Sequence, residues 1–278
     1  LTDFLQATRL REKTVIVVTS DHGEALGGHG ETYHGYYVYD STLRVPLIIT
    51  LPGTKNQTPE VSQPVSLLDV APTILQIVGI PRPPQMQGRG LLASILGKPQ
   101  NPVPIYSESL FANLHFGWGP LRCLDLGRYK LILSKKSELF DLEEDPGERK
   151  NLFSENRAMG LECKHRLEEI VTTYTRNVPQ KELPKLSEEA LSKLRALGYI
   201  GAPSQALTSI AEDLPDPKDR IQLYNLYLKA GALDCASPTG KCLPQVRELY
   251  QSGRELPIGP ETESPSRCVN PRTRQDLR

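Results

Sequence analysis

Two residues able to bind a divalent metal follow the apolar run Val15-Ile16-Val17-Val18. A carboxylate and a neutral imidazole together suit a divalent cation, so Asp21 and His22 are candidate metal ligands. The alternative is a plain turn in which Asp21 caps the next segment. Four consecutive β-branched residues predict a strand buried on both faces, as in the centre of an α/β sheet. Ligand sites in such sheets lie beyond the carboxyl ends of the strands.

A glycine-rich loop follows this pair, with glycines at positions 23, 27, 28, 30 and 35. Glycines let a loop fold closely over a bound ligand. The loop also holds His29, which we expect to stabilise it, and His34. Four tyrosines lie in or directly after the loop: Tyr33, Tyr36, Tyr37 and Tyr39. They either line a substrate cleft or cover the loop against the core.

The run SDHGEALGGHGETYHGYYVYDSTLRVPLIITLPG resembles the sulfatase family of the alkaline-phosphatase-like superfamily. The resemblance continues through PVSLLDVAPTIL, QGRGLL, YSESLFANLHFGWGPLRCL, RYKLI and ELFDLEEDPGERKNL. Later pieces, residues 193–201 and LPDPKDRIQLYNLY, are similar to a bacterial subgroup in which tetratricopeptide repeats follow the sulfatase domain.

The resemblance implies an α/β fold. We expect a partial alkaline-phosphatase-like sheet with flanking helices, then a small antiparallel β subdomain, then C-terminal helices. The predicted division is 1–102 for the C-terminal part of the α/β core and 103–180 for the subdomain with a helix. Residues 181–232 would form a helical linker or the start of a repeat region, and 233–278 a disordered tail.

The family also implies metal-dependent hydrolysis of sulfate esters, with Asp21 and His22 in the metal shell. Calcium is the expected metal, because it is the usual one in the family. Calcium prefers oxygen ligands, so the nitrogen ligand His22 leaves Mn²⁺, Mg²⁺ or Zn²⁺ as alternatives. Many sulfatases have a lysine near position 34 that contacts the sulfate and the leaving oxygen. We therefore expect His34 to be catalytic and to bind substrate; a second-metal ligand and a structural role are the alternatives. His115, near Trp118, would contact substrate at the rim, or else belong to a packed loop.

One motif of the family is absent from the chain. Sulfatases carry Cys/Ser-x-Pro-x-Arg, whose first residue becomes a formylglycine nucleophile, and no such motif occurs among the 278 residues. The amino-terminal Asp-Asp metal ligands are also absent. We therefore expect this chain to be the carboxyl-terminal part of a sulfatase and to be inactive alone. The formylglycine is expected in the missing amino-terminal part. A phosphodiesterase or phosphonate hydrolase of the same superfamily, or a non-catalytic remnant or interaction module, remain alternatives.

Composition constrains the partners. Thirty-three basic and 33 acidic residues balance to a formal charge of zero, which argues against nucleic acid as a partner. No apolar run approaches the roughly 20 residues of a membrane span. Expected partners are a sulfate-ester small molecule or glycan, and a protein bound by the repeat region. The family implies a periplasmic, secreted or membrane-attached location. The five cysteines predict free thiols, with a Cys235–Cys242 disulfide as the alternative.

The predicted elements surround the loop. Helices are expected at 1–11, 91–96, 154–174 and 187–197. Two more are expected from the Asp69 cap to Gly79 and from Asp216-Pro217 to Gly231. Leu161 and Leu167 are expected on the buried face of the helix at 154–174. Strands are expected at 14–19 and 43–51, and a meander at 104–108, 121–126, 129–133 and 138–142. An ion pair between Arg44 and Asp40 or another carboxylate is also expected.

Overall fold

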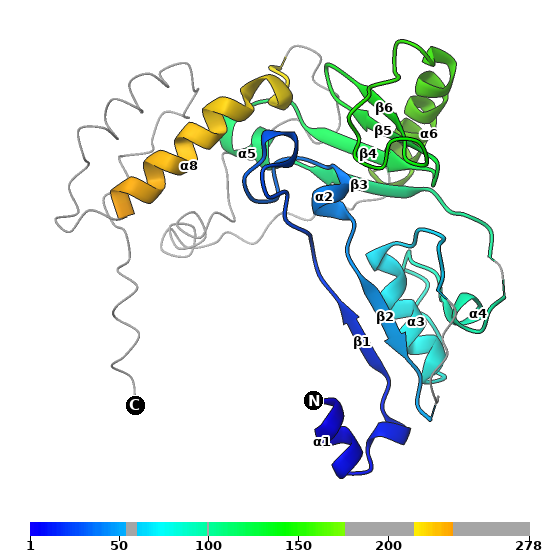
Figure 1. The fold of residues 1–278 in the computed structure, drawn as a ribbon. Helices are drawn as coiled ribbons and strands as arrows, with labels where there is room; N and C mark the ends of the chain where they lie inside the picture. The colour runs from blue at the N-terminus through cyan, green and yellow to red at the C-terminus, as the bar shows by residue number, and fades with distance from the viewer. Residues whose placement is uncertain (54–59, 99, 176–213, 236–278) are drawn as a thin grey trace, which may run out of the picture.

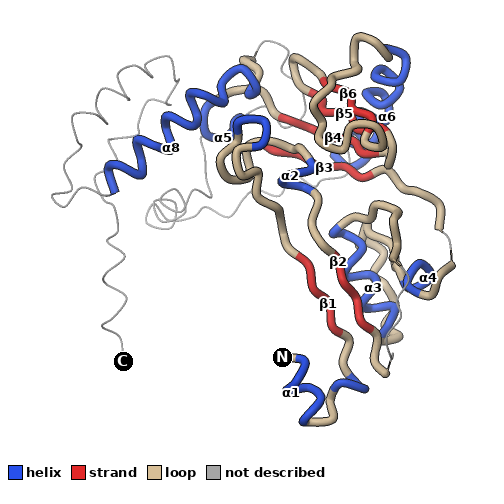
Figure 2. The backbone as a smooth tube through the Cα atoms, viewed as in Figure 1, coloured by secondary structure: helices blue, strands red, loops and turns tan. Residues whose placement is uncertain are grey.

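The computed structural model describes residues 1–53, 60–98, 100–175 and 214–235. This part contains a two-stranded antiparallel ribbon and a four-stranded antiparallel sheet, with helices beside both (Figures 1 and 2). The loop between the two strands of the ribbon lies next to the four-stranded sheet (Figure 1). This mixed arrangement confirms the predicted α/β class with a small antiparallel subdomain.

The ribbon consists of β1 (Ile16–Thr19) and β2 (Leu47–Thr50), preceded by helix α1 (Thr2–Ala7). The strands pair with Ile16 opposite Thr50 and Thr19 opposite Leu47. The prediction that the first strand is buried on both faces is wrong for the described chain. Val18 is 50% exposed and Ile48 is 57% exposed, because β2 is the one described strand paired with β1 and no described element covers these side chains.

Helix α3 (Val70–Ile77) follows the 3₁₀ turn Leu67–Asp69. Asp69 directly precedes α3, as predicted, but its side chain makes no hydrogen bond to the amides of that helix. Its carboxylate instead accepts hydrogen bonds from the backbone amides of Ser66 (3.1 Å) and Arg89 (2.8 Å). The second bond also ties the helix start to the segment that leads into α4 (Leu92–Ile95), the predicted short helix. Asp69 thus closes a capping box with Ser66 on the turn before α3 and fixes the neighbouring segment.

The four-stranded sheet is the predicted meander, in the order β3 (Ile105–Ser109), β4 (Leu121–Asp125), β5 (Tyr129–Leu133) and β6 (Glu138–Asp141). Gly127 has a φ of 93°, a conformation that suits glycine, and its amide donates to Asp125 Oδ1 (2.6 Å). This turn joins β4 to β5 and confirms the turn expected there.

Helix α6 (Arg157–Thr175) packs against β4 and β5 (Figure 1). Cys163 and Leu167 are buried with Leu131 and Leu139 of the sheet. The prediction that Leu161 belongs to this face is wrong, because Leu161 is exposed. It lies six residues before Leu167, which places it roughly 120° around a helix of 3.6 residues per turn.

A second core lies between the sheet, helix α5 (Phe111–Phe116) and helix α8 (Ile221–Cys235). The ring of Tyr224 stacks on Tyr36 at 4.5 Å between centroids. Trp118 is fully buried in the same cluster. The predicted helix end at Gly231 is wrong, because α8 continues to Cys235; a single interior glycine weakens a helix by only about 1 kcal/mol.

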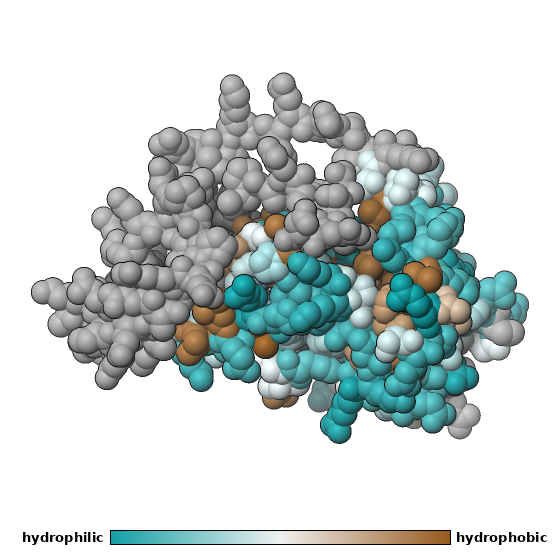
Figure 3. Space-filling model, turned by 90° about the horizontal axis from the view of Figure 1, so that it is seen from above, coloured by the Kyte–Doolittle hydropathy of each residue, from teal (hydrophilic) through white to brown (hydrophobic). Residues whose placement is uncertain are grey.

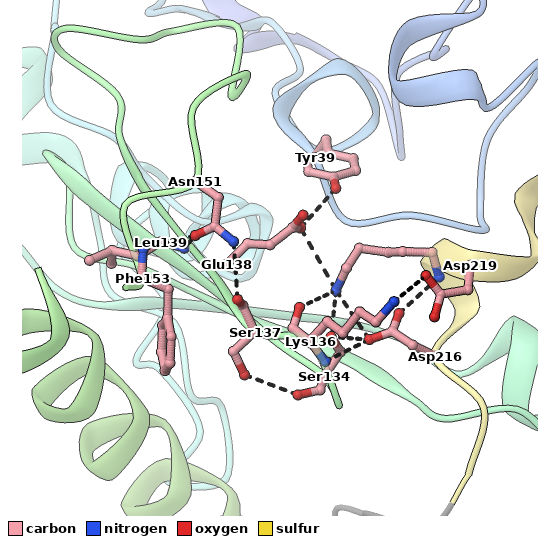
Figure 4. Close-up of polar contacts among 11 residues, drawn as sticks. Tyr39, Ser134, Lys136, Ser137, Glu138, Leu139, Asn151, Phe153, Asp216 and Asp219 are labelled. Carbon is pink, nitrogen blue, oxygen red and sulfur yellow. Dashed lines mark hydrogen bonds and ion pairs between the residues drawn. The ribbon is translucent and has the colours of Figure 1, made fainter. Parts of the chain in front are cut away.

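Polar contacts attach the start of this last segment to the connection between β5 and β6 (Figure 4). Asp216 accepts hydrogen bonds from Ser134 Oγ (2.7 Å) and from the backbone amides of Lys136 (2.8 Å) and Lys218 (2.9 Å). The last bond is the predicted cap, and Pro217 follows at the first helical position. Lys136 Nζ reaches Asp219 at 2.7 Å. Residues 214–220 are therefore anchored to the sheet.

Viewed from above, most of the described surface is hydrophilic, with hydrophobic residues in small groups (Figure 3). Among the described residues, no helix has the length and apolar character needed to cross a membrane. The helix expected at 187–197, residues 236–278 of the expected tail, and the Cys235–Cys242 pairing lie outside the described residues. Cys123 and Cys163 are free and buried, in agreement with the prediction of free thiols.

Candidate active site

The two predicted metal ligands lie directly beyond the end of β1. The side chain of Asp21 is exposed, and its Oδ1 accepts a hydrogen bond from the amide of His22 (3.0 Å). Hydrogen bonding from its own backbone amide, and then the neighbouring His22, lower the pKa of Asp21 below its usual value. His22 Nε2 lies 3.6 Å from Asp21 Oδ2. The pair presents one anionic oxygen and one nitrogen to solvent at the strand end.

The tautomer of His22 follows from its partner. Its Nδ1 lies 3.0 Å from the carbonyl oxygen of Gly23. A carbonyl oxygen only accepts, so Nδ1 must carry the proton and Nε2 has the free lone pair. Metal-binding histidines commonly have this arrangement, in which one ring nitrogen donates to a backbone carbonyl and the other binds the ion.

Backbone hydrogen bonds fold the glycine-rich loop back on itself. The amide of Gly23 donates to Thr42 (2.8 Å), and the amide of Ala25 donates to Tyr33 (2.8 Å). A Cβ atom at position 23 would lie 2.5 Å from the carbonyl oxygen of Ser41, so only glycine fits this close approach. Folding in this way brings residue 24 next to residue 34.

His34 is held by a carboxylate that sequence reasoning missed. His34 Nδ1 lies 2.6 Å from Glu24 Oε1, and the ring of His34 stacks on His22 with centroids 3.8 Å apart. The side chains of His22, Glu24 and His34 are 43%, 45% and 41% exposed, so solvent and ligands reach all three. The position of Glu24 two residues after His22 was the available signal, but its contact with His34 depends on how the loop folds.

A buried carboxylate fixes the far side of the loop. Glu31 is almost fully buried, and its two oxygens accept from the backbone amides of Tyr36 (2.8 Å) and Tyr37 (3.3 Å). Burial raises the pKa of Glu31, and the two amide hydrogen bonds oppose this rise. These bonds hold the turn that follows His34.

The loop tyrosines cover the core rather than line a cleft, with one exception. Tyr36, Tyr37 and Tyr39 are buried, whereas Tyr33 is exposed. The hydroxyl of Tyr36 donates to the carbonyl of Pro217 (2.7 Å), which connects the loop to the anchored C-terminal segment. Of the two interpretations left open by the sequence, core covering is correct for three of the four.

The end of the loop is attached to the sheet by a buried lysine. Lys130 Nζ on β5 lies 2.6 Å from Asp40 Oδ1 and 2.7 Å from Glu148 Oε1. Asp40 begins helix α2 (Asp40–Leu43), so it closes the loop. The sequence suggested Arg44 as a partner for Asp40; the ion pair that the structure shows for Asp40 is with Lys130, which comes from a distant strand.

The two remaining histidines of interest have aromatic neighbours. His29 has a φ of 51° and stacks on Tyr39 at 3.6 Å, which supports its predicted role in stabilising the loop. His115 is half-buried on α5, with its ring 4.3 Å from that of Phe111. Burial lowers the pKa of both histidines, so both favour the neutral form. The expected contact of His115 with substrate stays a prediction.

Residues 27–175 match the family described as N-sulphoglucosamine sulphohydrolase, C-terminal. The match covers more than half of the chain, and the chain therefore belongs to this sulfatase family. The fold agrees: a structure described as a 2-O GAG sulfatase superposes with a TM-score of 0.53 and 28% identity, over 63% of this chain and 39% of that one. A phosphonate monoester hydrolase from Silicibacter pomeroyi gives a TM-score of 0.50 and 26% identity, over 68% and 40%.

Curated relatives give the same class. The uncharacterized sulfatase YidJ of Escherichia coli K12 is 32% identical over 157 residues, which are 55% of this chain and 31% of the relative. A delta 4,5-hexuronate-2-O-sulfatase of Bacteroides thetaiotaomicron is 30% identical over 178 residues, or 60% and 37%. The chain thus spans about a third of the length of these relatives.

Proposed function

We propose that this chain supplies the metal-binding and leaving-group side of the active site of a sulfatase. One observation carries the proposal: Asp21, His22 and His34 gather at the carboxyl end of β1, and Glu24 holds His34 in place. The substrate class is a sulfate ester on a sugar hydroxyl. The relative named as a hexuronate 2-O-sulfatase and the structure named as a 2-O GAG sulfatase support this class.

Asp21 and His22 fit a divalent metal by the chemistry of their donor atoms, and their exposure leaves them accessible. Calcium is the proposed ion, with manganese, magnesium or zinc as alternatives. A metal bound there supplies Lewis-acid stabilisation of the charge that develops on the sulfate oxygens. The lowered pKa of Asp21 keeps its carboxylate ionised for this role at neutral pH.

His34 is the proposed donor to the leaving oxygen. Hydrolysis of a sulfate ester breaks the sulfur–oxygen bond to the sugar, and the departing oxygen needs a proton. Because Nδ1 of His34 lies against Glu24, Nε2 is the nitrogen free to face substrate. General acid catalysis of this kind contributes about 10²- to 10⁴-fold in rate. The nucleophile, a formylglycine by family resemblance, is proposed to lie outside this chain, which is then inactive alone.

A phosphonate monoester hydrolase is the second candidate. The structural likeness to the Silicibacter pomeroyi enzyme supports it. The same side chains would serve, because phosphonate and sulfate monoesters both place charge on non-bridging oxygens and need a stabilised leaving group. The difference between the two reactions therefore has to be measured on substrates.

The test compares the purified chain with the longest gene product that contains it. Both are assayed on 4-nitrophenyl sulfate, a 2-O-sulfated unsaturated hexuronate disaccharide and a phenyl phosphonate ester. We expect sulfate release by the longer product only, at least about 100-fold lower in Asp21→Ala and His34→Ala, and unchanged in His165→Ala. Preference for the phosphonate would favour the second candidate. Turnover that survives Asp21→Ala would exclude the proposed site.

A further inference from the structure

Helix α8 lies against the active-site loop, although the contacting residues Asn225 and Gly30 are 195 positions apart in the chain (Figure 1). Asn225 Nδ2 donates to the carbonyl oxygen of Gly30 (2.7 Å), and Asn225 Oδ1 accepts from the hydroxyl of Thr32 (3.3 Å). A Cβ atom added at Gly30 would lie 3.6 Å from the side chain of Ile221, so the helix also packs on this turn. One amide side chain therefore holds two loop residues that come just before His34.

The same segment holds the loop on the other side of His34. The ring of Tyr224 stacks on that of Tyr36 with centroids 4.5 Å apart, and the hydroxyl of Tyr36 donates to the carbonyl of Pro217 (2.7 Å). Tyr36 is fully buried. The backbone of His34 thus lies between two contacts with one short segment, and this segment limits where the His34 ring can lie.

The segment is itself anchored to the four-stranded sheet. Asp216, almost fully buried, accepts from Ser134 Oγ (2.7 Å) and from the backbone amide of Lys136 (2.8 Å) (Figure 4). The sheet also contacts the loop directly, because the hydroxyl of Ser109 on β3 donates to the carbonyl of Gly35 (2.6 Å). The sheet and α8 therefore form one support around the loop.

The supporting segment lies outside the residues that match the sulfatase family, which end at 175. A catalytic group must be held within about 0.5 Å of its productive position, and a misplacement of about 1 Å can lower the rate roughly 100-fold. We propose that Asn225 is a positioning residue for His34: by holding Gly30 and Thr32, it keeps the ring of His34 directed at the leaving oxygen. This role rests on the function proposed for His34.

The first test needs no hydrolase activity. Amide hydrogen exchange of the purified chain is compared in the wild type, Asn225→Leu and Gln222→Leu. Gln222 is the matched control, because it is an exposed amide side chain on the same helix. The amides of Tyr36 and Tyr37 report on the turn, since their acceptor Glu31 lies within it. We expect these amides to exchange about two- to tenfold faster in Asn225→Leu only, which is the effect of losing one hydrogen bond.

A second variant separates the contact from the packing of the helix. Asn225→Asp has nearly the same shape but replaces the donor to Gly30 with an acceptor. It should speed exchange as Asn225→Leu does, and near-ultraviolet circular dichroism checks that both variants keep their fold. Loop exchange that is unchanged in both variants, or equally fast in Gln222→Leu, would overturn the proposal.

The last test measures turnover of the 2-O-sulfated disaccharide by the longest gene product that contains the chain. Asn225→Leu should lower kcat at least about tenfold with KM little changed, and Gln222→Leu should change neither. In the His34→Ala background, Asn225→Leu should cause no further loss, because it acts through His34. An additive loss would overturn the proposal. Full activity of His34→Ala would overturn the function proposed for His34, and the role of Asn225 in catalysis with it, whereas unchanged loop exchange overturns the role of Asn225 alone.

Discussion

Replacing Lys130 with methionine tests how the β subdomain supports the active-site loop. Lys130 Nζ contacts Asp40 Oδ1 (2.6 Å) and Glu148 Oε1 (2.7 Å), and both Lys130 and Glu148 are almost fully buried. Glu148 also accepts a hydrogen bond from the backbone amide of Asp40 (2.6 Å). Because Asp40 closes the loop that carries Glu24 and His34, this network joins β5 to the candidate site.

The magnitude follows from the burial of the network. Methionine is similar in length to lysine and keeps most of the packing, but it leaves Asp40 and Glu148 without their cation. Removing one partner of a buried ion pair costs about 3–5 kcal/mol. For a chain of this size, each kcal/mol lowers the melting temperature by about 2–4 °C, so the expected loss is on the order of 10 °C.

The assay is thermal and urea unfolding, followed by far-ultraviolet circular dichroism and by the fluorescence of Trp118, the single tryptophan. Lys136→Met is the matched control, because Lys136 makes an exposed ion pair with Asp219, and the loss of such a pair should change stability little. The double variant Lys130→Met/Glu148→Gln should recover part of the loss, since one stranded carboxylate becomes neutral. Equal stability of the two single lysine variants would refute the reasoning.

Three further predictions concern the loop and its anchors. Gly23→Ala should disrupt the loop and lower the melting temperature, because its Cβ would lie 2.5 Å from the carbonyl oxygen of Ser41, whereas Gly28→Ala, whose Cβ would meet nothing closer than 3.9 Å, should not; thermal melting decides, and equal effects would contradict the prediction. Glu31→Ala leaves two buried amides without an acceptor and should lower the free energy of unfolding in urea by about 1–3 kcal/mol; no loss would show that the amides find other partners. Burial opposes ionisation of Asp216, but Lys218 and several hydrogen bonds outweigh it, and the pKa of Asp216 lies below its ordinary value of 3.8. Its stabilisation is therefore fully present above about pH 4 and is lost as pH falls through the lower folded value. The stability gap between the wild type and Asp216→Asn should shrink in acid, and a gap independent of pH would rule out this linkage.

Local patterns predicted most of the elements. Alternating apolar residues and turn signals identified the four strands of the meander, the start of α3 was correctly placed after Asp69, and the Asp216 cap marked the start of the last helical segment. These features depend on hydrogen bonds and side-chain periodicity within a few residues, which the sequence displays directly. The adjacency of Asp21 and His22 beyond a strand end was likewise visible.

Burial was harder to predict, because it depends on which other segments pack nearby. The β-branched run before Asp21 has the composition of a central strand, yet Val18 is half exposed in the described chain. Leu161 is apolar, yet it points away from the sheet. An apolar residue specifies a preference for burial, while the neighbouring elements decide whether burial occurs.

The sequence by itself determined the family, the strand and helix pattern, and the cluster of histidines in a glycine-rich loop. Only the tertiary structure decided which side chains meet. Glu24 reaches His34 across ten residues because the loop folds back, and Asp40 meets Lys130 across ninety because β5 passes the loop end. Side-chain contacts between distant segments require the backbone path, and residue spacing alone does not specify that path.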